Sequence, residues 1–513
     1  MKKLVYLTIV LLTMTVTSCS DFLDRNPSGT LSETSFWQNR SDFESAMTAI
    51  YASMRIGNAW TAQGMIYWDN LTDNGFGQHR ESQYGYTTEI VEGNITPQTG
   101  GFIGQLYGHM FQAIARVNIF LAQLERFEGG DISQADRDRF TGEALFFRAF
   151  FYSFLYLTYG NVPLVTEPLT VETQFQPKVE AAQVAAQIQR DLAEAIRLLP
   201  DVPYNGRVTR NAARAFKARM IMNDAYDANG NAIPAQMTAA LALLNQISGY
   251  SLSPNFTDIF QGSGQAGNPE IMFSVRFVAP NLRHWNWTTV GWWIAVAPLT
   301  NLIELFQFYD GTPFSVNDPR FDPSNPTANR DPRMQETMQY GTFSYNGFSI
   351  QGANQLPTGF TVTKFLYRGD GSHIPGSEWT FEDDSDWVHI RYAEVLLMRA
   401  EAENELNGPN AIVYDAINTI RARVNIPPLP AGLTQAQMRE EIRRERRVEM
   451  AFEGLRYFDL RRWRIIGEVM NNLVEPKIPG LTPRYEPHFD RWPIPQVQID
   501  RSNGVLVQNP GYI

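Results

Sequence analysis

Cys19 is the single cysteine of the 513-residue chain, and it follows a short basic and apolar leader. Lys2 and Lys3 precede an apolar run over residues 4–16, which is shorter than the roughly 20 residues that a membrane-spanning helix needs. Such a run is typical of a secretory signal peptide. Small residues stand before the thiol, as in a bacterial lipobox, so the pattern predicts a signal peptide over residues 1–18, cleavage before Cys19 and acylation of Cys19. Several acyl chains together anchor a protein stably to a membrane.

Aromatic and polar side chains in two irregular stretches could bind sugar rings. A sugar ring has an apolar face that an indole can cover and a rim of hydroxyl groups that carboxylates and amides can hydrogen-bond. Packing beneath a loop is the alternative for any one of these tryptophans, because tryptophan is usually mostly buried. The predicted ligand-binding residues are Trp60, Trp68, Asp69, Asn70, Asp73, Trp292 and Trp293.

Other reactive motifs have little support. The six histidines show no HExxH or repeated ligand spacing, and no GxSxG motif occurs, so the sequence predicts neither a metal centre nor a nucleophilic serine. Residues 262–267 spell GxGxxG, but Asn268 and Pro269 follow them, which favours a flexible loop over a dinucleotide site. Residues 382–386 could hold calcium, although we expect a solvated acidic turn there.

Composition narrows the classes of partner. Hydrophobic residues make up 43% of the chain, which is enough for a large core. Removal of the leader, which carries two lysines, changes the net charge from −11 to −13. An acidic surface argues against nucleic acid as a partner. With Cys19 acylated, no disulfide can form, so stability must come from packing.

Helical patterns dominate both ends of the chain. Apolar residues nearly all round predict a buried helix over 141–159, and a stripe at helical spacing predicts another after Glu180. Further helices are expected from Asn211 to about Tyr226, after Pro234, over 387–406 and over 411–424. Thr434 and Gln437 form a capping box for a helix expected to continue to about Phe458. The successive segments indicate stacked helical hairpins.

Two stretches interrupt this pattern. Residues 57–108 contain ten glycines, and residues 248–386 are rich in proline, glycine, asparagine and tryptophan. Long aromatic-rich loops in a compact protein are usually functional. Alternation over 271–277 predicts one short strand. We therefore expect one domain over 19–513, with a helical scaffold over about 30–247 and 387–470, a loop-rich insert over about 248–386 and an irregular end over 471–513.

Blocks spread over the whole sequence resemble the SusD/RagB family of surface nutrient-binding lipoproteins. The blocks are residues 19–24, 142–150, 159–164, 391–402, 420–423, 445–463, 492–495 and 508–512. The resemblance implies an all-α-dominated fold of four tetratricopeptide-like helix pairs, a loop-rich ligand-facing portion and little β structure. It also implies that Arg446, Arg447, Glu449, Glu453, Arg456 and Asp459 form a structural charge network at helix ends.

The resemblance implies a function as well. Family members capture nutrients, chiefly glycans, at the outer face of the outer membrane and pass them to a SusC-like TonB-dependent transporter. Asp21 and Asp24 resemble the family's export signal, and residues 67–74 resemble its early ligand loop. The expectation is therefore a non-catalytic, lipid-anchored glycan-binding protein without cofactors. Three alternatives stay open, namely a peptide binder, an adhesive surface protein and a surface glycoside hydrolase, which would need two carboxylates at a defined separation.

Overall fold

The computed structural model describes residues 36–55, 62–80, 86–345, 348–350, 355–366 and 383–512. The predicted signal peptide, Cys19 and Trp60 lie outside these ranges. Within them, no helix is both long and apolar enough to cross a bilayer.

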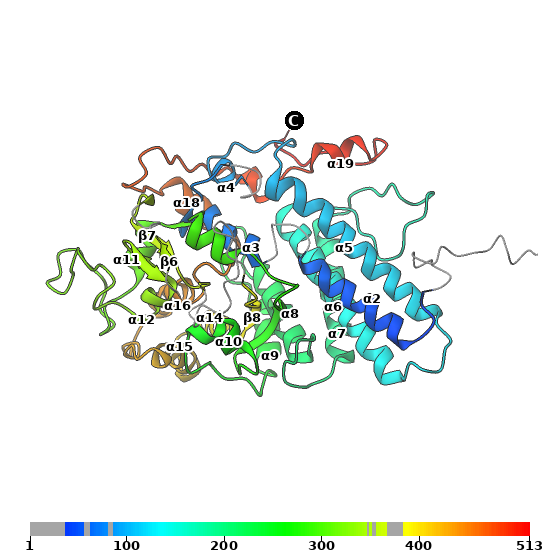
Figure 1. Ribbon diagram of the computed structural model, residues 1–513, viewed down its shortest axis with the longest axis horizontal. Coiled ribbons are helices and arrows are strands. Elements are labelled where there is room, and N and C mark those ends of the chain that lie inside the picture. The colour runs from blue at the N-terminus through cyan, green and yellow to red at the C-terminus, as the bar shows by residue number, and fades with distance from the viewer. Residues whose placement is uncertain are drawn as a thin grey trace, which may run out of the picture.

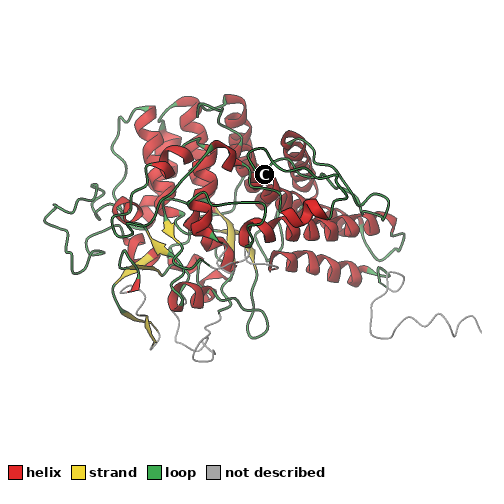
Figure 2. Ribbon diagram, turned by 90° about the horizontal axis from the view of Figure 1, so that it is seen from above, coloured by secondary structure: helices red, strands yellow, loops and turns green. Residues whose placement is uncertain are grey.

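Helices dominate the molecule, as the sequence predicts (Figures 1 and 2). The longer ones are α2 (Arg40–Ala52), α5 (Gly101–Arg126), α6 (Gln134–Thr158), α7 (Ala181–Leu198), α8 (Arg210–Asn223), α9 (Pro234–Leu244), α14 (Tyr392–Asn407), α15 (Ala411–Arg423) and α16 (Gln435–Glu449). The shorter ones are η2 (Ser53–Arg55), α3 (Ala62–Met65), η3 (Ile66–Leu71), α4 (Thr87–Val91), η5 (Thr257–Ile259), α10 (Gly262–Gln265), η6 (Thr288–Trp292), α11 (Thr300–Leu305), α12 (Pro332–Thr337), α17 (Arg456–Arg462), α18 (Ile466–Asn471), η7 (Pro487–Asp490) and α19 (Gln496–Asp500).

Among the described residues, the strands are short and form two-stranded sheets, all antiparallel. They are β1 (Gly75–Phe76) with β3 (Ala297–Pro298), β2 (Ile271–Val275) with β8 (Trp387–Arg391), β4 (Met338–Tyr340) with β7 (Phe360–Val362), and β5 (Phe343–Tyr345) with β6 (Phe348–Ile350). The strand predicted over 271–277 is therefore confirmed as β2, two residues shorter.

Successive helices pack on one another across the molecule. α6 lies against α5 and α7, α8 joins α7 to α9, and α14 packs on α9, α15 and α16. Figure 1 shows this series running from α2 and α5 at one end to α15 and α16 at the other. The arrangement is consistent with the expected stack of helical hairpins.

Local sequence explains the scaffold helices. α6 is buried on nearly every side from Gly142 to Tyr156, as its apolar composition predicts. α7 buries the predicted stripe of Val184, Ile188 and Leu192. The capping box of Thr434 and Gln437 is present at the start of α16, where each side chain accepts a backbone N–H of the other.

Some predicted boundaries are wrong. Residues 387–391 form strand β8, because their backbone pairs with that of β2, and the helix begins only at Tyr392. α16 ends at Glu449, and positive φ angles at Phe452 and Gly454 reverse the chain before α17. Thr209, not Asn211, caps α8. The 26-residue α5 begins inside the stretch expected to be irregular.

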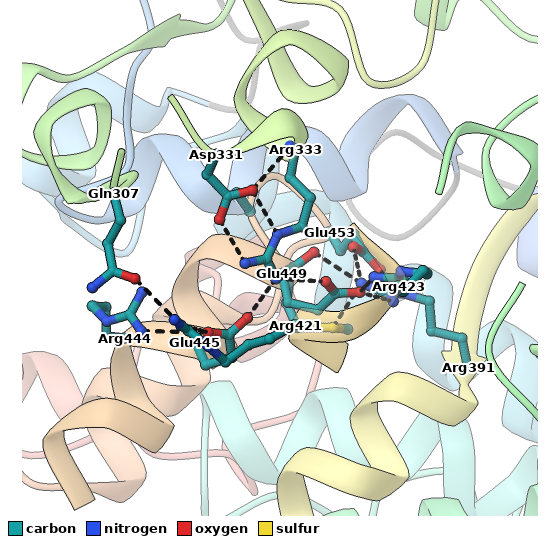
Figure 3. Close-up of polar contacts among 12 residues, drawn as sticks. Gln307, Asp331, Arg333, Arg391, Arg421, Arg423, Arg444, Glu445, Glu449 and Glu453 are labelled. Atoms are coloured by element: carbon teal, nitrogen blue, oxygen red, sulfur yellow. Dashed lines mark hydrogen bonds and ion pairs between the residues drawn. The ribbon is translucent and has the colours of Figure 1, made fainter. Parts of the chain in front are cut away.

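A buried charge network joins the insert to the helical scaffold (Figure 3). The Arg391 guanidinium lies 2.8 Å from Glu270 and 2.6 Å from Glu449. Arg333 pairs with Asp331 at 2.7 Å and Glu445 at 2.6 Å, and Lys364 pairs with Glu453 at 2.6 Å. Since Glu270, Asp331, Arg333 and Lys364 belong to the insert, ion pairs fix its position on α14–α16.

The charge network expected at the helix ends is part of this system. Arg446 pairs with Asp459 at 2.7 Å, and Arg447 and Arg456 both pair with Asp73. Burial alone would raise the pKa of Glu449, but the positive charges of Arg423, Arg391 and Arg333 hold this pKa well below its usual value. Every member therefore has an opposite charge beside it, which is the structural role that the sequence predicts.

Candidate ligand-binding surface

The two irregular stretches meet, as the prediction of a joint site requires. β1 pairs with β3, so that Gly75 faces Pro298 and Phe76 faces Ala297. His79 Nε2 lies 2.8 Å from the carbonyl oxygen of Trp293. A side chain at Gly75 would meet Asn70 Oδ1 at 2.8 Å, so this glycine leaves room for the Asn70 side chain beside β1.

Trp68 does not face a ligand, and its predicted role as a stacking platform is wrong. Its side chain is 0% exposed. The indole lies in an aromatic cluster with Phe102, Phe458 and Trp492, at ring-centroid distances of 5.2, 5.0 and 5.4 Å. The aromatic content that indicated a binding surface is here the interior of the protein, since a large apolar ring gains more from packing than from exposure.

Asp69, Asn70 and Asp73 are likewise buried, and the structure contradicts their predicted ligand contacts. Asp69 accepts hydrogen bonds from the backbone N–H of Phe452 at 3.2 Å and of Gly454 at 2.9 Å. Burial raises the pKa of Asp69 to about 6 despite these bonds. Asn70 donates to Ala295 O at 3.4 Å, across the junction of the two stretches.

Asp73 is held by arginine. Arg456 donates to its two carboxylate oxygens, each at 2.9 Å, and Arg447 lies 3.1 Å away. Burial would raise the pKa of Asp73, but the two guanidinium groups hold it at about 2. Both carboxylates of the segment thus stabilise the chain reversal after α16 instead of reaching solvent.

The tryptophans of the second stretch divide between interior and surface. Trp287 is buried, whereas Trp285 is 38% exposed and Trp293 is partly buried. Trp285 and Trp293 meet edge to face, with ring centroids 5.8 Å apart and planes at 69°. Trp292 ends the π-helical turn η6, and its side chain lies outside the described part of the structure. π-Helical turns occur frequently at functional sites.

A hairpin carries Trp285. Val278 and Leu282 exchange backbone hydrogen bonds of 2.7 and 2.8 Å, and both side chains are exposed. His284 exchanges two further backbone bonds with Asp383, and His284 Nε2 lies 2.7 Å from Ser385 O. The exposed apolar side chains Val278, Leu282 and Trp285 are therefore presented on a backbone that is fixed at its base.

The acidic turn provides this fixation. Asp384 accepts the N–H of Ala279 at 3.1 Å, and Asp386 accepts the N–H of Phe277 at 3.0 Å. Asp383 is buried, so the expectation of a solvated turn is wrong. Glu382 lies outside the described residues, and within those residues no group of three or more His, Cys, Asp or Glu could hold a metal ion.

A polar groove of about 480 Å³ lies beside the hairpin, within the size range of ligand sites. Its lining is Tyr204, Asn205, Gly206, Gly262, Ser263, Gln265, Ala266, Gly267, Ile271, Arg276, Phe277, Val278, Asp384 and Asp386. Residues 262–265 form the short helix α10, where the sequence indicated a flexible loop. A side chain at Gly206 would meet Arg276 Nη1 at 2.5 Å, so this glycine leaves room for the arginine at the groove wall.

The structure thus identifies residues that the site prediction omitted. Trp285 belongs to the tryptophan-rich segment but was not among the predicted ligand contacts, and Asn205, Ser263 and Arg276 carry no sequence motif. The one signal for His79 is its place in the first glycine-rich stretch. Contacts between segments about 200 residues apart decide which of these side chains face solvent.

Comparison with known proteins places the chain in a family. Two family models match, one described as "SusD family" over residues 263–512 and one as "Starch-binding associating with outer membrane" over residues 21–222. SusD-like protein P2 of Formosa agariphila is 24% identical over 99% of both chains.

Solved structures agree with these matches. A SusD-like carbohydrate binding protein from Bacteroides fragilis is 27% identical, with a TM-score of 0.78 over 92% of this chain and 99% of that one. Surface glycan-binding protein A from Bacteroides thetaiotaomicron, solved with laminarihexaose, is 20% identical, with a TM-score of 0.66 over 92% and 99% of the two chains. The chain belongs to the SusD/RagB family.

Proposed function

We propose that the protein is a lipid-anchored surface receptor that binds glycans and delivers them to a SusC-like TonB-dependent transporter. The observation that carries glycan binding is the edge-to-face pair of Trp285, next to the fixed hairpin, and Trp293, whose backbone contacts His79 where the two irregular stretches meet. The partly exposed indoles would cover the apolar faces of sugar rings. The adjoining groove would supply hydroxyl partners such as Asn205 and Ser263.

The relatives support this assignment. The Bacteroides fragilis structure with the higher identity is that of a carbohydrate binding protein, and the Bacteroides thetaiotaomicron structure contains a bound oligosaccharide. A shallow, wet site of this kind implies dissociation constants between about 1 μM and 1 mM, or roughly −8 to −4 kcal/mol.

Binding without hydrolysis is favoured by the state of the groove carboxylates. Asp384 and Asp386 both accept backbone N–H groups, and Asp386 also pairs with Arg276 at 3.0 Å. Both carboxylates thus help to fix the hairpin, whereas a glycosidase needs two carboxyl groups placed as acid and nucleophile on either side of the scissile bond. Incubation with labelled oligosaccharides should leave them intact, and cleavage that disappears in Asp384→Asn would establish the hydrolase alternative instead.

A glycan array followed by calorimetry tests the ligand class. We expect binding of one family of oligosaccharides that weakens in Trp285→Ala. If the protein binds immobilised peptides but no glycans, the peptide-binding alternative is favoured. If it binds neither, an adhesive role is favoured.

Anchoring and partnership require separate experiments. Cys19→Ala should leave an unlipidated precursor, and labelling of this variant by a fatty acid would contradict the lipobox.

Extraction in mild detergent followed by pull-down should recover a large β-barrel protein in near-equal amount, because a lid over a transporter needs an interface above the roughly 1,600 Å² of a standard complex. Recovery of the protein alone in several detergents would contradict the partnership.

A further inference from the structure

Four arginines line a second polar pocket, of about 80 Å³, at the C-terminal end of α6. They are Arg461, Arg462, Arg464 and Arg491, and the remaining lining residues are Tyr156, Leu157, Asn223, Asp224, Phe458 and Asp490. None of these residues lines the groove beside the hairpin. The four guanidinium groups differ in how far protein contacts satisfy them.

Two of the arginines are committed to the protein. Arg462 pairs with Glu401 at 2.5 Å and with Asp459 at 2.8 Å. Arg461 donates to the carbonyl oxygens of Leu157 and Asp490, and so caps the negative end of α6. Its buried Nε makes no hydrogen bond within the described residues, and the Asp490 carboxylate lies 3.5 Å away.

Arg491 and Arg464 lack such partners. Among the described residues, neither of these two guanidinium groups forms an ion pair with a carboxylate, whereas Arg461 and Arg462 do. Arg491 donates to Asp490 O at 3.2 Å. Burial and the charge of Arg461 lower the pKa of Arg491, although Tyr156, Asp490 and Asp224 partly oppose this shift. A side chain at Gly160 would meet Arg491 Nε at 2.4 Å, so the glycine that ends α6 makes room for this arginine.

Arg464 occupies a position where glycine is usual. It follows the C-cap of α17 with φ of 61°, and Ile465 N donates to Leu460 O at 3.0 Å, as in a Schellman motif. The left-handed conformation is unfavourable for an arginine. The hydrogen bonds from Arg464 to Asp227 O and Tyr226 O are long, at 3.3 and 3.5 Å. They therefore do not explain why an arginine and not a glycine stands at this position.

The carboxylates of the pocket leave a positive excess. Asp224 accepts a hydrogen bond from Tyr156 Oη at 2.7 Å, and Tyr485 Oη donates to Asp490. With Arg462 neutralised by its own partners, Arg461, Arg464 and Arg491 face two carboxylates. The pocket has room for about five to eight water-sized groups, at about 10–15 Å³ each, which is enough for a tetrahedral oxyanion.

We propose that this pocket is a binding site for a small oxyanion, either a free sulfate or phosphate or the same group carried on a sugar. Arg464 and Arg491 would hold the anion through their planar N–H forks, with Arg461 adding positive charge behind them. The inference rests on the pocket alone and does not depend on glycan binding at the hairpin.

Calorimetry on the full-length protein in mild detergent tests the site, with sodium sulfate as the probe and sodium chloride holding the ionic strength constant. We expect saturable binding that falls about tenfold or more in Arg464→Gly and in Arg491→Gln. Arg464→Gly is the more informative of the two variants. Because glycine adopts the left-handed conformation freely, we expect the fold to be kept while the guanidinium is removed. Arg126→Gln, at an exposed arginine in the last turn of α5, is the matched control and should bind as the wild type does.

A thermal melt gives an independent readout. Sulfate should raise the melting temperature of the wild type and of Arg126→Gln more than that of Arg464→Gly, since a ligand stabilises the state that binds it. Absence of saturable sulfate and phosphate binding by the wild type, or equal binding by Arg464→Gly and Arg126→Gln, would overturn the proposal.

Comparison of a sulfated monosaccharide with its unsulfated parent identifies the source of the anion. Binding of the sulfated sugar that Arg464→Gly abolishes assigns the site to anionic glycans. Binding of inorganic sulfate without the sulfated sugar assigns it to a free ion. Equal binding of the unsulfated parent at this pocket would contradict recognition of an oxyanion.

Discussion

Trp68 and Trp492 stack face to face, with ring centroids 5.4 Å apart and ring planes 5° apart. Trp492 Nε1 also donates to Tyr457 Oη at 3.1 Å. This pair joins the first irregular stretch to the C-terminal segment, two parts of the chain that the sequence predicts to be loops. The tryptophan of the early segment is therefore a packing residue that positions the ligand-facing loops.

Trp68→Ala should destabilise the fold. Loss of a fully buried indole removes its contacts with Phe102, Phe458 and Trp492 and leaves a cavity, at a cost of about 3–5 kcal/mol. Urea unfolding followed by circular dichroism measures the loss. Trp68→Phe should lose less, because an aromatic ring remains in the stack. Unchanged stability together with lost glycan binding would restore Trp68 as a ligand contact.

Trp285→Ala should weaken glycan binding and leave the stability of the fold nearly unchanged. Since its indole is 38% exposed and stands on a surface hairpin, we expect unfolding free energy within about 0.5 kcal/mol of the wild type. Glycan affinity should fall by about 1–3 kcal/mol, as for loss of one anchoring aromatic residue. Tyr309→Ala, at an aromatic side chain that is 55% exposed outside the proposed surface, is the control and should bind normally. Equal losses of glycan affinity in Trp285→Ala and Tyr309→Ala would mean that the proposed binding surface is wrong.

The helical scaffold could be predicted because its signals are local. The apolar composition of α6, the stripe of α7 and the capping box at Thr434 depend on neighbours within a few turns, and all three are present. The boundary at Tyr392 could not be predicted in this way. Residues 387–391 form a strand only because β2, more than 100 residues earlier, supplies their hydrogen-bond partners.

The site could be predicted only as a region. Composition located two aromatic stretches, and the pairing of β1 with β3 brings them into contact in the fold. Exposure of individual side chains depends on long-range packing, so Trp68 and Trp285 looked alike in sequence although one is buried and one is not. Asp73 resembled a hydroxyl partner because its two arginines lie more than 370 residues later in the chain.

Stability should depend on Asp73 in a defined pH window. Arg447 and Arg456 hold its pKa at about 2, below the roughly 3.9 of an unfolded chain. The contribution of the ionised carboxylate is therefore complete above about pH 4 and is lost as the pH falls through about 2. Two pKa units correspond to about 2–3 kcal/mol. The difference in unfolding free energy between wild type and Asp73→Asn should reach this size at pH 5 and shrink towards pH 2, and a difference independent of pH would contradict the ion pair.

Glu449 and Glu440 lie on the same helix and should respond differently to the same change. Glu449 pairs with Arg333, Arg391 and Arg423 at 3.0, 2.6 and 2.5 Å in the buried network, whereas the Glu440 side chain is 71% exposed and lies 3.5 Å from Arg443. Glu449→Gln leaves buried guanidinium charge uncompensated, so we expect a loss of about 3–5 kcal/mol. Glu440→Gln should change stability by about 0.5 kcal/mol or less. Because Glu449 pairs with Arg333 of α12 and Arg391 of β8, hydrogen exchange in α12 and β8 should also become faster in Glu449→Gln. Equal stability of the two variants, with exchange unchanged, would show that the network does not hold the insert on the scaffold.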